Sequence, residues 1–177
     1  MPRTPLSRET LLPRLAAHVL EHGLAGASLR PLARAAGTSD RMLIYHFGSK
    51  DALVAALLGH LAMLFTASLD AAFPGTRFAS RGECARAVIA MTDSEALRPF
   101  LRVWWDIVAD CARGNAASLE AAGAIMDRLM LWVETHLPAD DPDPGEGARA
   151  TLTMIEGAQM LSAIDRRSIA KAALSAL

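Results

Sequence analysis

The sequence predicts an all-α protein in which a small N-terminal helical module joins a larger helical body. Alanine and leucine are abundant, and apolar residues recur at three- and four-residue intervals. Glycine and proline fall between these periodic segments, where they punctuate helices. Alternating β-branched residues, which would indicate strands, are scarce.

The first helix is expected over about residues 7–22, ending at Gly23. Pro13 leaves two alternatives: it kinks this helix, or the helix begins near Thr10 and Pro13 lies in its first turn. Good capping residues then predict three more helices. Ser28 caps one that ends at Gly37, Ser39 caps a short one to about His46, and Ser49 caps a long one over 50–72.

The body begins after a break at 73–75, which reads Phe-Pro-Gly. Helices are expected over 80–92, 97–113 and 116–137. Residues 138–147 are rich in aspartate, proline and glycine and predict a mobile acidic loop. A helix over 148–164 and a short final one over 166–176 complete the prediction. The long fourth helix is expected to join the module to the body.

Charge is distributed unevenly along the 177 residues, although the net charge is only −1. Residues 1–50 hold seven Lys and Arg against three Asp and Glu, and the remainder holds eleven against sixteen. A basic end on an acidic body is consistent with a polyanionic partner for the first part. A solvated surface would show the same balance, so the charge alone decides little.

Several features point to a soluble, cytoplasmic protein that does not enter the membrane. No early apolar run follows the first arginines, as a secretory signal would require. The apolar stretch 97–111 is interrupted by Arg102, Asp106 and Asp110, which favours a buried soluble helix. Cys84 and Cys111 form no close pair and have no metal-ligand spacing, which fits a reducing compartment.

Residues 28–47 have the pattern of a helix-turn-helix. Leu29, Leu32, Ala33 and Ala36 would face inward from its first helix, a glycine opens a three-residue turn, and small residues permit a close helix crossing. On the second helix, Leu43 and Phe47 are one turn apart and would pack against the first. The outer surface would then present four side chains that suit the major groove of DNA, namely Thr38, Arg41, Met42 and Tyr45.

The same run, followed by Gly-Ser-Lys-Asp-Ala-Leu at 48–53, resembles the signature of TetR-family transcriptional regulators over about residues 7–55. The resemblance implies a DNA-binding domain at 1–55 and a ligand-binding and dimerisation domain at 56–177. Two departures are Ile44, where the family often has a tyrosine, and Pro31, where a polar residue is frequent. Ile44 puts one phosphate contact in doubt.

Carried onto this chain, the resemblance places bases near the start of the recognition helix and phosphates near its end. A helix N-terminus and its lysine also favour an anion at residue 50 on physical grounds. The implied DNA-binding residues are Ser28, Arg30, Thr38, Ser39, Arg41, Met42, Tyr45, His46 and Lys50.

The body is expected to bind a small, largely apolar effector of unknown identity and to form a homodimer. Flexible methionines and tryptophans suit such a pocket, although they are more often plain core. The pocket candidates are Met63, Met91, Trp104, Trp105, Met126 and Met130. Helices 116–137 and 148–164 have broad apolar stripes and are implied to pair with their symmetry mates. The candidates for this interface are Leu129, Trp132, Val133, Leu152, Ile155 and Ala158.

The function predicted is that of a repressor released from a palindromic operator by its effector, with activation as an alternative. A zinc peptidase is the competing class, because His18, Glu21 and His22 match the letters of an inverted zinc motif. No third ligand is evident at a supporting spacing, and the helix ends at Gly23. We therefore expect no enzyme activity, no metal and no cofactor.

Overall fold

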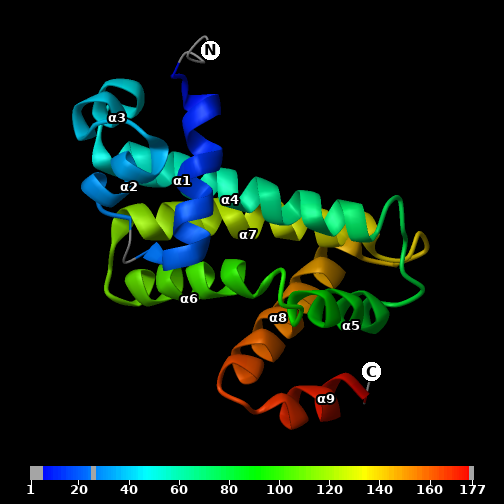
Figure 1. The fold of residues 1–177 in the computed structure, drawn as a ribbon. Coiled ribbons are helices and arrows are strands. Elements are labelled where there is room, and N and C mark those ends of the chain that lie inside the picture. The colour runs from blue at the N-terminus through cyan, green and yellow to red at the C-terminus, as the bar shows by residue number, and fades with distance from the viewer. Residues whose placement is uncertain (1–5, 25–26, 176–177) are drawn as a thin grey trace. The chain divides into compact units, whose positions relative to one another are not determined.

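The computed structural model describes residues 6–24 and 27–175, and all regular structure within them is helical (Figure 1). The all-α prediction is confirmed. The helices are α1 Arg8–His22, α2 Leu29–Ala36, α3 Asp40–Phe47, α4 Lys50–Ala72, α5 Arg81–Thr92, α6 Arg98–Ala112, α7 Ala116–His136, α8 Pro144–Ala163 and α9 Arg167–Ser175.

Most helix ends lie within a residue or two of the predicted ones, and one prediction near a proline is wrong. α1 begins at Arg8 and ends at His22, as predicted for a helix over about 7–22, so the alternative start near Thr10 is excluded. Pro13 lies beyond the first turn and removes one helical hydrogen bond. α8 begins at Pro144 rather than at 148, because Asp143 caps it and a proline suits the first helical position. Residues 144–147 are therefore helix, not loop. The predicted end of the last helix at 176 lies outside the described residues.

The chain divides into two compact units that interleave along the sequence. Unit one comprises the chain up to Phe65 together with Pro99–Ile125, and unit two comprises Thr66–Arg98 and the chain from Met126 onward. The first unit therefore contains α6 and the start of α7 besides the N-terminal helices. The functional division near residue 55 stays a prediction, since compactness does not follow it.

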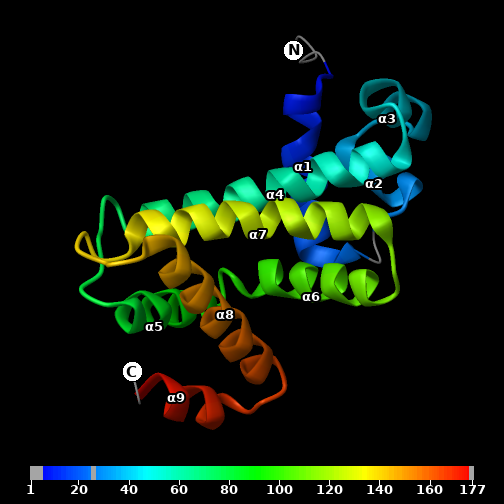
Figure 2. The ribbon, with the colours of Figure 1, turned by 180° about the vertical axis from the view of Figure 1, so that it is seen from behind.

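In unit one the first four helices lie together with α6 and the start of α7 (Figure 1, Figure 2), and they share a single apolar core. Fully buried leucines come from each of the first four helices, and α6 adds Val103 and Ile107. Ala121, Ala122 and Ile125 of α7 pack against the same cluster. The buried members from the first four helices are Leu11, Leu15, Ala16, Val19, Leu32, Ala33, Ala36, Leu43, Phe47, Leu53, Leu57, Leu58 and Leu61.

The first part of α4 belongs to this core. By length and composition α4 is the one described helix that could cross a membrane, which is weak evidence. Leu53, Leu57 and Leu61 of α4 are buried among the side chains of unit one. Burial of these leucines accounts for part of the apolar composition of α4.

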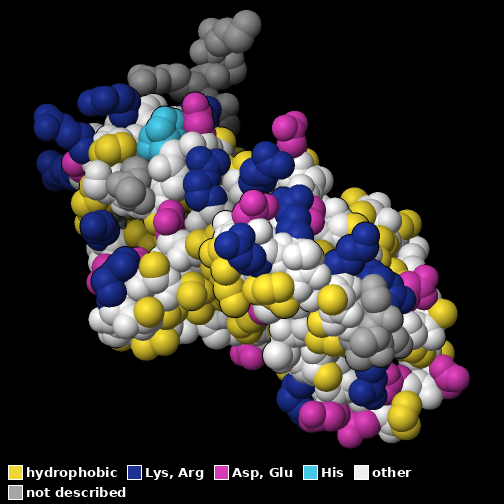
Figure 3. Space-filling model, turned by 90° about the horizontal axis from the view of Figure 1, so that it is seen from below, with side chains coloured by type: hydrophobic (Ala, Val, Ile, Leu, Met, Phe, Trp, Pro, Cys, Tyr) yellow, Lys and Arg dark blue, Asp and Glu magenta, His cyan; other side chains and the backbone are white. Residues whose placement is uncertain are grey.

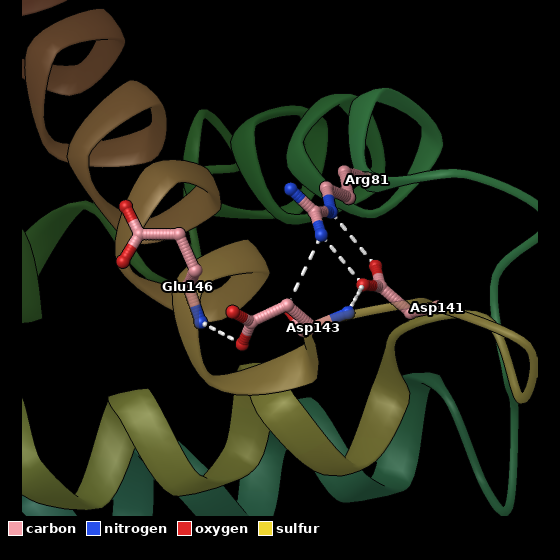
Figure 4. A network of polar contacts seen from close by, with 4 residues as sticks. All are labelled: Arg81, Asp141, Asp143 and Glu146. Atoms are coloured by element: carbon pink, nitrogen blue, oxygen red, sulfur yellow. Dashed lines mark hydrogen bonds and ion pairs between the residues drawn. The ribbon is translucent and has the colours of Figure 1, made fainter.

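Unit two centres on α5 packed against α8, held at one end by a polar network (Figure 4). Arg81 donates from Nε and Nη2 to the two carboxylate oxygens of Asp141, at 2.7 and 2.5 Å, and from Nη2 to the carbonyl of Asp143. This pairing raises the pKa of the Arg81 guanidinium and holds the pKa of Asp141 below its ordinary value. A Cβ on Gly147 would lie 2.7 Å from Arg81, so the glycine makes room for the network.

Candidate nucleic-acid interface

The turn between α2 and α3 is set by the backbone. Gly37 ends α2 in the left-handed conformation, with φ +68°, which a residue bearing a Cβ adopts at a cost. The Thr38 amide donates to the Ala33 carbonyl at 2.9 Å, and the Gly37 amide donates to Arg34 at 3.1 Å. Ser39 then caps α3 by accepting from the Met42 amide. The predicted cap by the Ser28 side chain is absent, since no side-chain cap hydrogen bond is made at the start of α2.

One face of α3 is anchored and the other is free. Leu43 and Phe47 are buried against α2 and α1, as their four-residue spacing predicts. On the other face, Arg41 is exposed and Tyr45 is 78% exposed, a large fraction for an aromatic side chain. A rigid helix that presents a cation and an aromatic ring to solvent has the form of a major-groove reader.

The remaining predicted DNA-binding residues surround this face with differing exposure. Ser28, Arg30, Ser39 and Lys50 are exposed, whereas Thr38, Met42 and His46 are half-buried. The Nε2 atom of His46 is buried and has no hydrogen-bond partner among the described residues.

The start of α4 adds a second positively polarised element. Ser49 caps this helix by accepting from the Ala52 amide at 3.1 Å, and Lys50 stands exposed in the first turn. Dark-blue Lys and Arg side chains gather at the end of the face in Figure 3 that carries α2 and α3. The exposed cations of these three helices are Arg30, Arg34, Arg41 and Lys50.

Sequence reasoning missed two arginines of α1 that hold the helix-turn-helix by its ends. Arg14 donates from Nη1 to the carbonyl of Ala36, the last residue of α2, at 3.1 Å. Arg8 donates from Nε to the His46 carbonyl at 2.6 Å, in the last turn of α3. The partners are 22 and 38 residues away, so no local pattern could have revealed them.

Comparison with known proteins agrees with this geometry. Residues 15–57, from within α1 into α4, match the family of bacterial regulatory proteins, tetR family. A transcriptional regulator from Streptomyces coelicolor A3(2) is 25% identical, with a TM-score of 0.73 over 97% of each chain. A structure assigned to the TetR-family regulators from Rhodococcus sp. is 18% identical, with a TM-score of 0.71 over 94% of this chain and 93% of that one.

Residues 15–57 are thus similar to the DNA-binding segment of TetR-family regulators. The fold of the chain is shared with the multidrug binding protein EbrR in a complex with imidazole, at 20% identity and a TM-score of 0.70, over 97% of this chain and 94% of that one. No curated protein matches the sequence. The segment that matches the tetR family contains the whole of α2 and α3.

The residues predicted to line an effector pocket fall in both units. Met63, Trp104 and Trp105 belong to unit one, and Met91, Met126 and Met130 belong to unit two. Trp104 packs against the apolar core of unit one, whereas Met63 is 48% exposed. Neither unit by itself brings the six together, so the pocket stays a prediction.

Five of the six residues predicted at the dimer interface are already buried within a single chain. α8 turns its stripe towards α5, and α7 turns Trp132 and Val133 inward, so these side chains are buried without a partner and their place in an interface stays a prediction. The Trp132 indole donates to Asp70 at 2.8 Å and stacks on His136. Those five are Trp132, Val133, Leu152, Ile155 and Ala158, and only Leu129 is half-buried.

The three residues of the zinc-like motif lie at the end of α1 without the geometry of a metal site. The His18 and His22 rings stack with centroids 4.3 Å apart, and His22 Nδ1 contacts the His18 carbonyl at 3.0 Å. Across residues 6–24 and 27–175 no group of three or more His, Cys, Asp or Glu could hold a metal ion. The geometry therefore offers no support for the peptidase alternative.

Proposed function

We propose that this protein is a TetR-family repressor that binds a roughly palindromic operator as a homodimer and is released by a small, largely apolar effector. The observation that carries the DNA-binding part is the two-sided recognition helix. Leu43 and Phe47 fix α3 in the core of unit one, which leaves Arg41 and Tyr45 free to meet DNA. The protein would act in the cytoplasm, on chromosomal DNA.

Base contacts are assigned to the start of α3 and phosphate contacts to its end. Thr38, Ser39, Arg41 and Met42 would read base edges, since they begin the helix that enters the major groove. Tyr45, His46 and Lys50 would hold the sugar–phosphate backbone, with Ser28 and Arg30 contributing from the start of α2. Phosphate contacts position a protein and base contacts specify its sequence, so the two sets separate experimentally.

The dimer would use apolar side chains of the α7 and α8 region that are exposed in the single chain. Leu119 and Leu131 of α7, Met160 of α8, and Ile164, which directly follows α8, are each 47% or more exposed. A second copy that covered these side chains would remove apolar surface from water, at roughly 25 cal/mol per Å².

The effector would act by a population shift. Structures of EbrR, which has the same fold, were determined with imidazole and with proflavin. We infer that the body of this protein also takes a small apolar ligand, with the six predicted methionines and tryptophans as its candidate lining. Binding would favour dimers whose recognition helices no longer match major grooves about 34 Å apart.

Selection of bound duplexes from a random DNA library tests the DNA-binding proposal. The expected product is a two-fold symmetric site, with affinity that falls steeply as salt rises. Arg41→Ala should relax the sequence preference at one base position, whereas Lys50→Ala should lower the affinity for all DNA sequences about equally. A library from which no preferred sequence emerges contradicts the proposal.

Two further measurements test assembly and the direction of regulation. Met160→Asp should yield folded monomers by sedimentation velocity and weaken binding to the full palindrome. Transcription in vitro from a promoter that carries the selected site should fall on addition of protein; a rise would replace repression with activation. A folded Met160→Asp monomer that binds the palindrome as tightly as wild type would overturn the dimer proposal.

A further inference from the structure

Arg8, the first residue of α1, is held in place at the end of the recognition helix. Its Nε donates to the His46 carbonyl at 2.6 Å, and its Cζ lies 5.5 Å from the centroid of the Phe47 ring. The His46 carbonyl is among the last four of α3, which have no partner within the helix, and a cation suits that negatively polarised end. Two contacts from different directions thus orient an exposed guanidinium.

The hydrogen bond uses only one of the five donors of Arg8. The two terminal nitrogens, Nη1 and Nη2, contact no acceptor among the described residues, and Arg8 forms no ion pair with any described carboxylate. A guanidinium presents its remaining N–H groups as a planar fork that fits two phosphate oxygens. A charge that is held in place and has no carboxylate partner among residues 6–24 and 27–175 is suited to an external anion.

The surroundings of Arg8 indicate which anion this is. Its acceptor, His46, is four residues from Lys50, and the turn between them joins the end of α3 to the start of α4. We propose that Arg8 is a further DNA-binding residue, which uses Nε to fix the end of α3 and its terminal nitrogens to bind a backbone phosphate. This rests on the proposed DNA-binding function and adds to it a contact made from α1.

Two substitutions separate the structural role from the electrostatic one. In Arg8→Gln, the side-chain Nε2 occupies the same place along the chain as arginine Nε, so the donor to His46 is retained and the charge is lost. In Arg8→Lys, the charge is retained, but a carbon stands where Nε was. If Arg8 only fixes α3, DNA binding should tolerate Gln at this position and not Lys. If Arg8 binds a phosphate, the salt dependence of DNA affinity should change with Gln and be kept with Lys.

The experiment measures the affinity of the full-length protein for one selected operator at several salt concentrations. Removal of one phosphate contact should reduce the slope of log K against log salt by about 0.9, hence by about 1.8 for a dimer that uses both copies. We expect this reduction for Arg8→Gln, with unchanged thermal stability and an equal loss of affinity on unrelated sequences. Arg8→Lys should keep a slope close to that of wild type.

Arg102→Gln is the matched control. Arg102 donates from Nη2 to the Leu20 carbonyl at 3.3 Å, so it too is an arginine that holds a helix end. Leu20 is twelve residues beyond Arg8, about 18 Å along the axis of α1. Removal of this charge should leave the slope unchanged, which excludes a long-range effect of net charge.

The outcomes keep the two proposals apart. A wild-type protein without sequence preference would overturn the DNA-binding function and the role of Arg8 with it. Specific binding by wild type, together with an unchanged slope for Arg8→Gln, would overturn the role of Arg8 alone. An equal reduction in slope for Arg8→Gln and Arg102→Gln would also overturn it, because the effect would not depend on position.

Discussion

The two compact units differ in where they keep their polar groups. In unit one the core is apolar, and polar side chains hold the backbone from outside: Arg8, Arg14 and Arg102 donate to carbonyls at helix ends, and the Leu24 amide donates to Asp106 at 2.9 Å. In unit two polar side chains lie inside. All three buried polar residues among those described belong to it, namely Thr92, Thr151 and Gln159.

This difference bears on what each unit does. An apolar core with its helix ends secured gives a rigid frame, which a recognition helix needs in order to keep its angle in the groove. Buried hydroxyl and amide groups make packing directional, because each loses stability unless it finds a partner. Gln159 donates to Thr92 at 3.4 Å between α8 and α5, so this contact helps to fix the register of the two helices. The comparison predicts that substitutions in the two units act by different mechanisms.

The largest effect is expected from a charge inside unit two. Ile155 lies on α8, which packs against α5, and its side chain is only 2% exposed. Ile155→Asp would bury an unpaired carboxylate there and lower the free energy of unfolding by about 4 kcal/mol or more. Circular dichroism should show loss of helix or a large fall in melting temperature. Met160→Asp on the exposed face of the same helix is the control and should keep the fold. If Ile155→Asp instead gave a folded monomer, Ile155 would be an interface residue after all.

A cavity in unit one should cost less and should also disturb DNA binding. Leu43 is fully buried on the inner face of α3, and Leu43→Ala should lower the free energy of unfolding by about 2–5 kcal/mol. Because α3 loses its anchor, operator affinity should fall as well. Tyr45→Ala, two residues away on the exposed face, should reduce affinity without changing stability. Equal stability of the two variants in urea titration would contradict the two-sided view of α3.

These two predictions show where sequence reasoning succeeds and where it stops. The helix-turn-helix was predictable because Gly37, Ser39 and Ser49 act locally: each sets the backbone or caps the helix in which it lies. Contacts such as Arg8 with His46, or Asp106 with Leu24, join residues 38 and 82 apart and depend on the packed fold. The residues predicted at the dimer interface show the same limit of local sequence patterns. An apolar stripe on α8 indicates that something covers it, but not whether the cover is α5 or another chain.

Replacing each of two threonines in unit two by valine should change the stability of the protein in opposite directions. The Thr151 hydroxyl is fully buried and has no hydrogen-bond partner among the described residues, so Thr151→Val should stabilise the protein by about 1 kcal/mol. The Thr92 hydroxyl donates to the Ile89 carbonyl and accepts from Gln159, so Thr92→Val should destabilise by about 1 kcal/mol or more. Chemical denaturation measures both. A shared sign would mean that hydroxyl pairing does not govern this core.

Acid should weaken the Arg81 network of unit two specifically. The hydrogen bond from Arg81 holds the pKa of Asp141 below its ordinary value, so the ionised carboxylate stabilises the folded state. That contribution is complete above the unfolded pKa, about 3.9, and is lost as pH falls through the lower folded value. Asp141→Asn should therefore lower the melting temperature at pH 7, and the difference from wild type should shrink towards pH 2. A difference that stays constant across this range would exclude linkage through Asp141.

The smallest perturbation uses the two cysteines, one in each unit, as separate reporters. Cys84 of α5 is fully buried, and burial raises the pKa of its thiol to about 12, with a further contribution from Glu83. At pH 8 only about one thiol in ten thousand would then be the reactive thiolate, so a thiol reagent should reach Cys84 only when unit two opens. Cys111 of α6 is half-buried in unit one and should react first.

Thr92→Val should accelerate the labelling of Cys84 and leave the rate at Cys111 unchanged, because it loosens the α5–α8 contact alone. Leu43→Ala should do the opposite, since Leu43 and Cys111 belong to the core of unit one. Mass spectrometry of peptides after timed labelling resolves the two sites. If every variant accelerated both cysteines equally, the two units would open together. The division between a rigid reader and a polar-cored body would then describe packing but not dynamics.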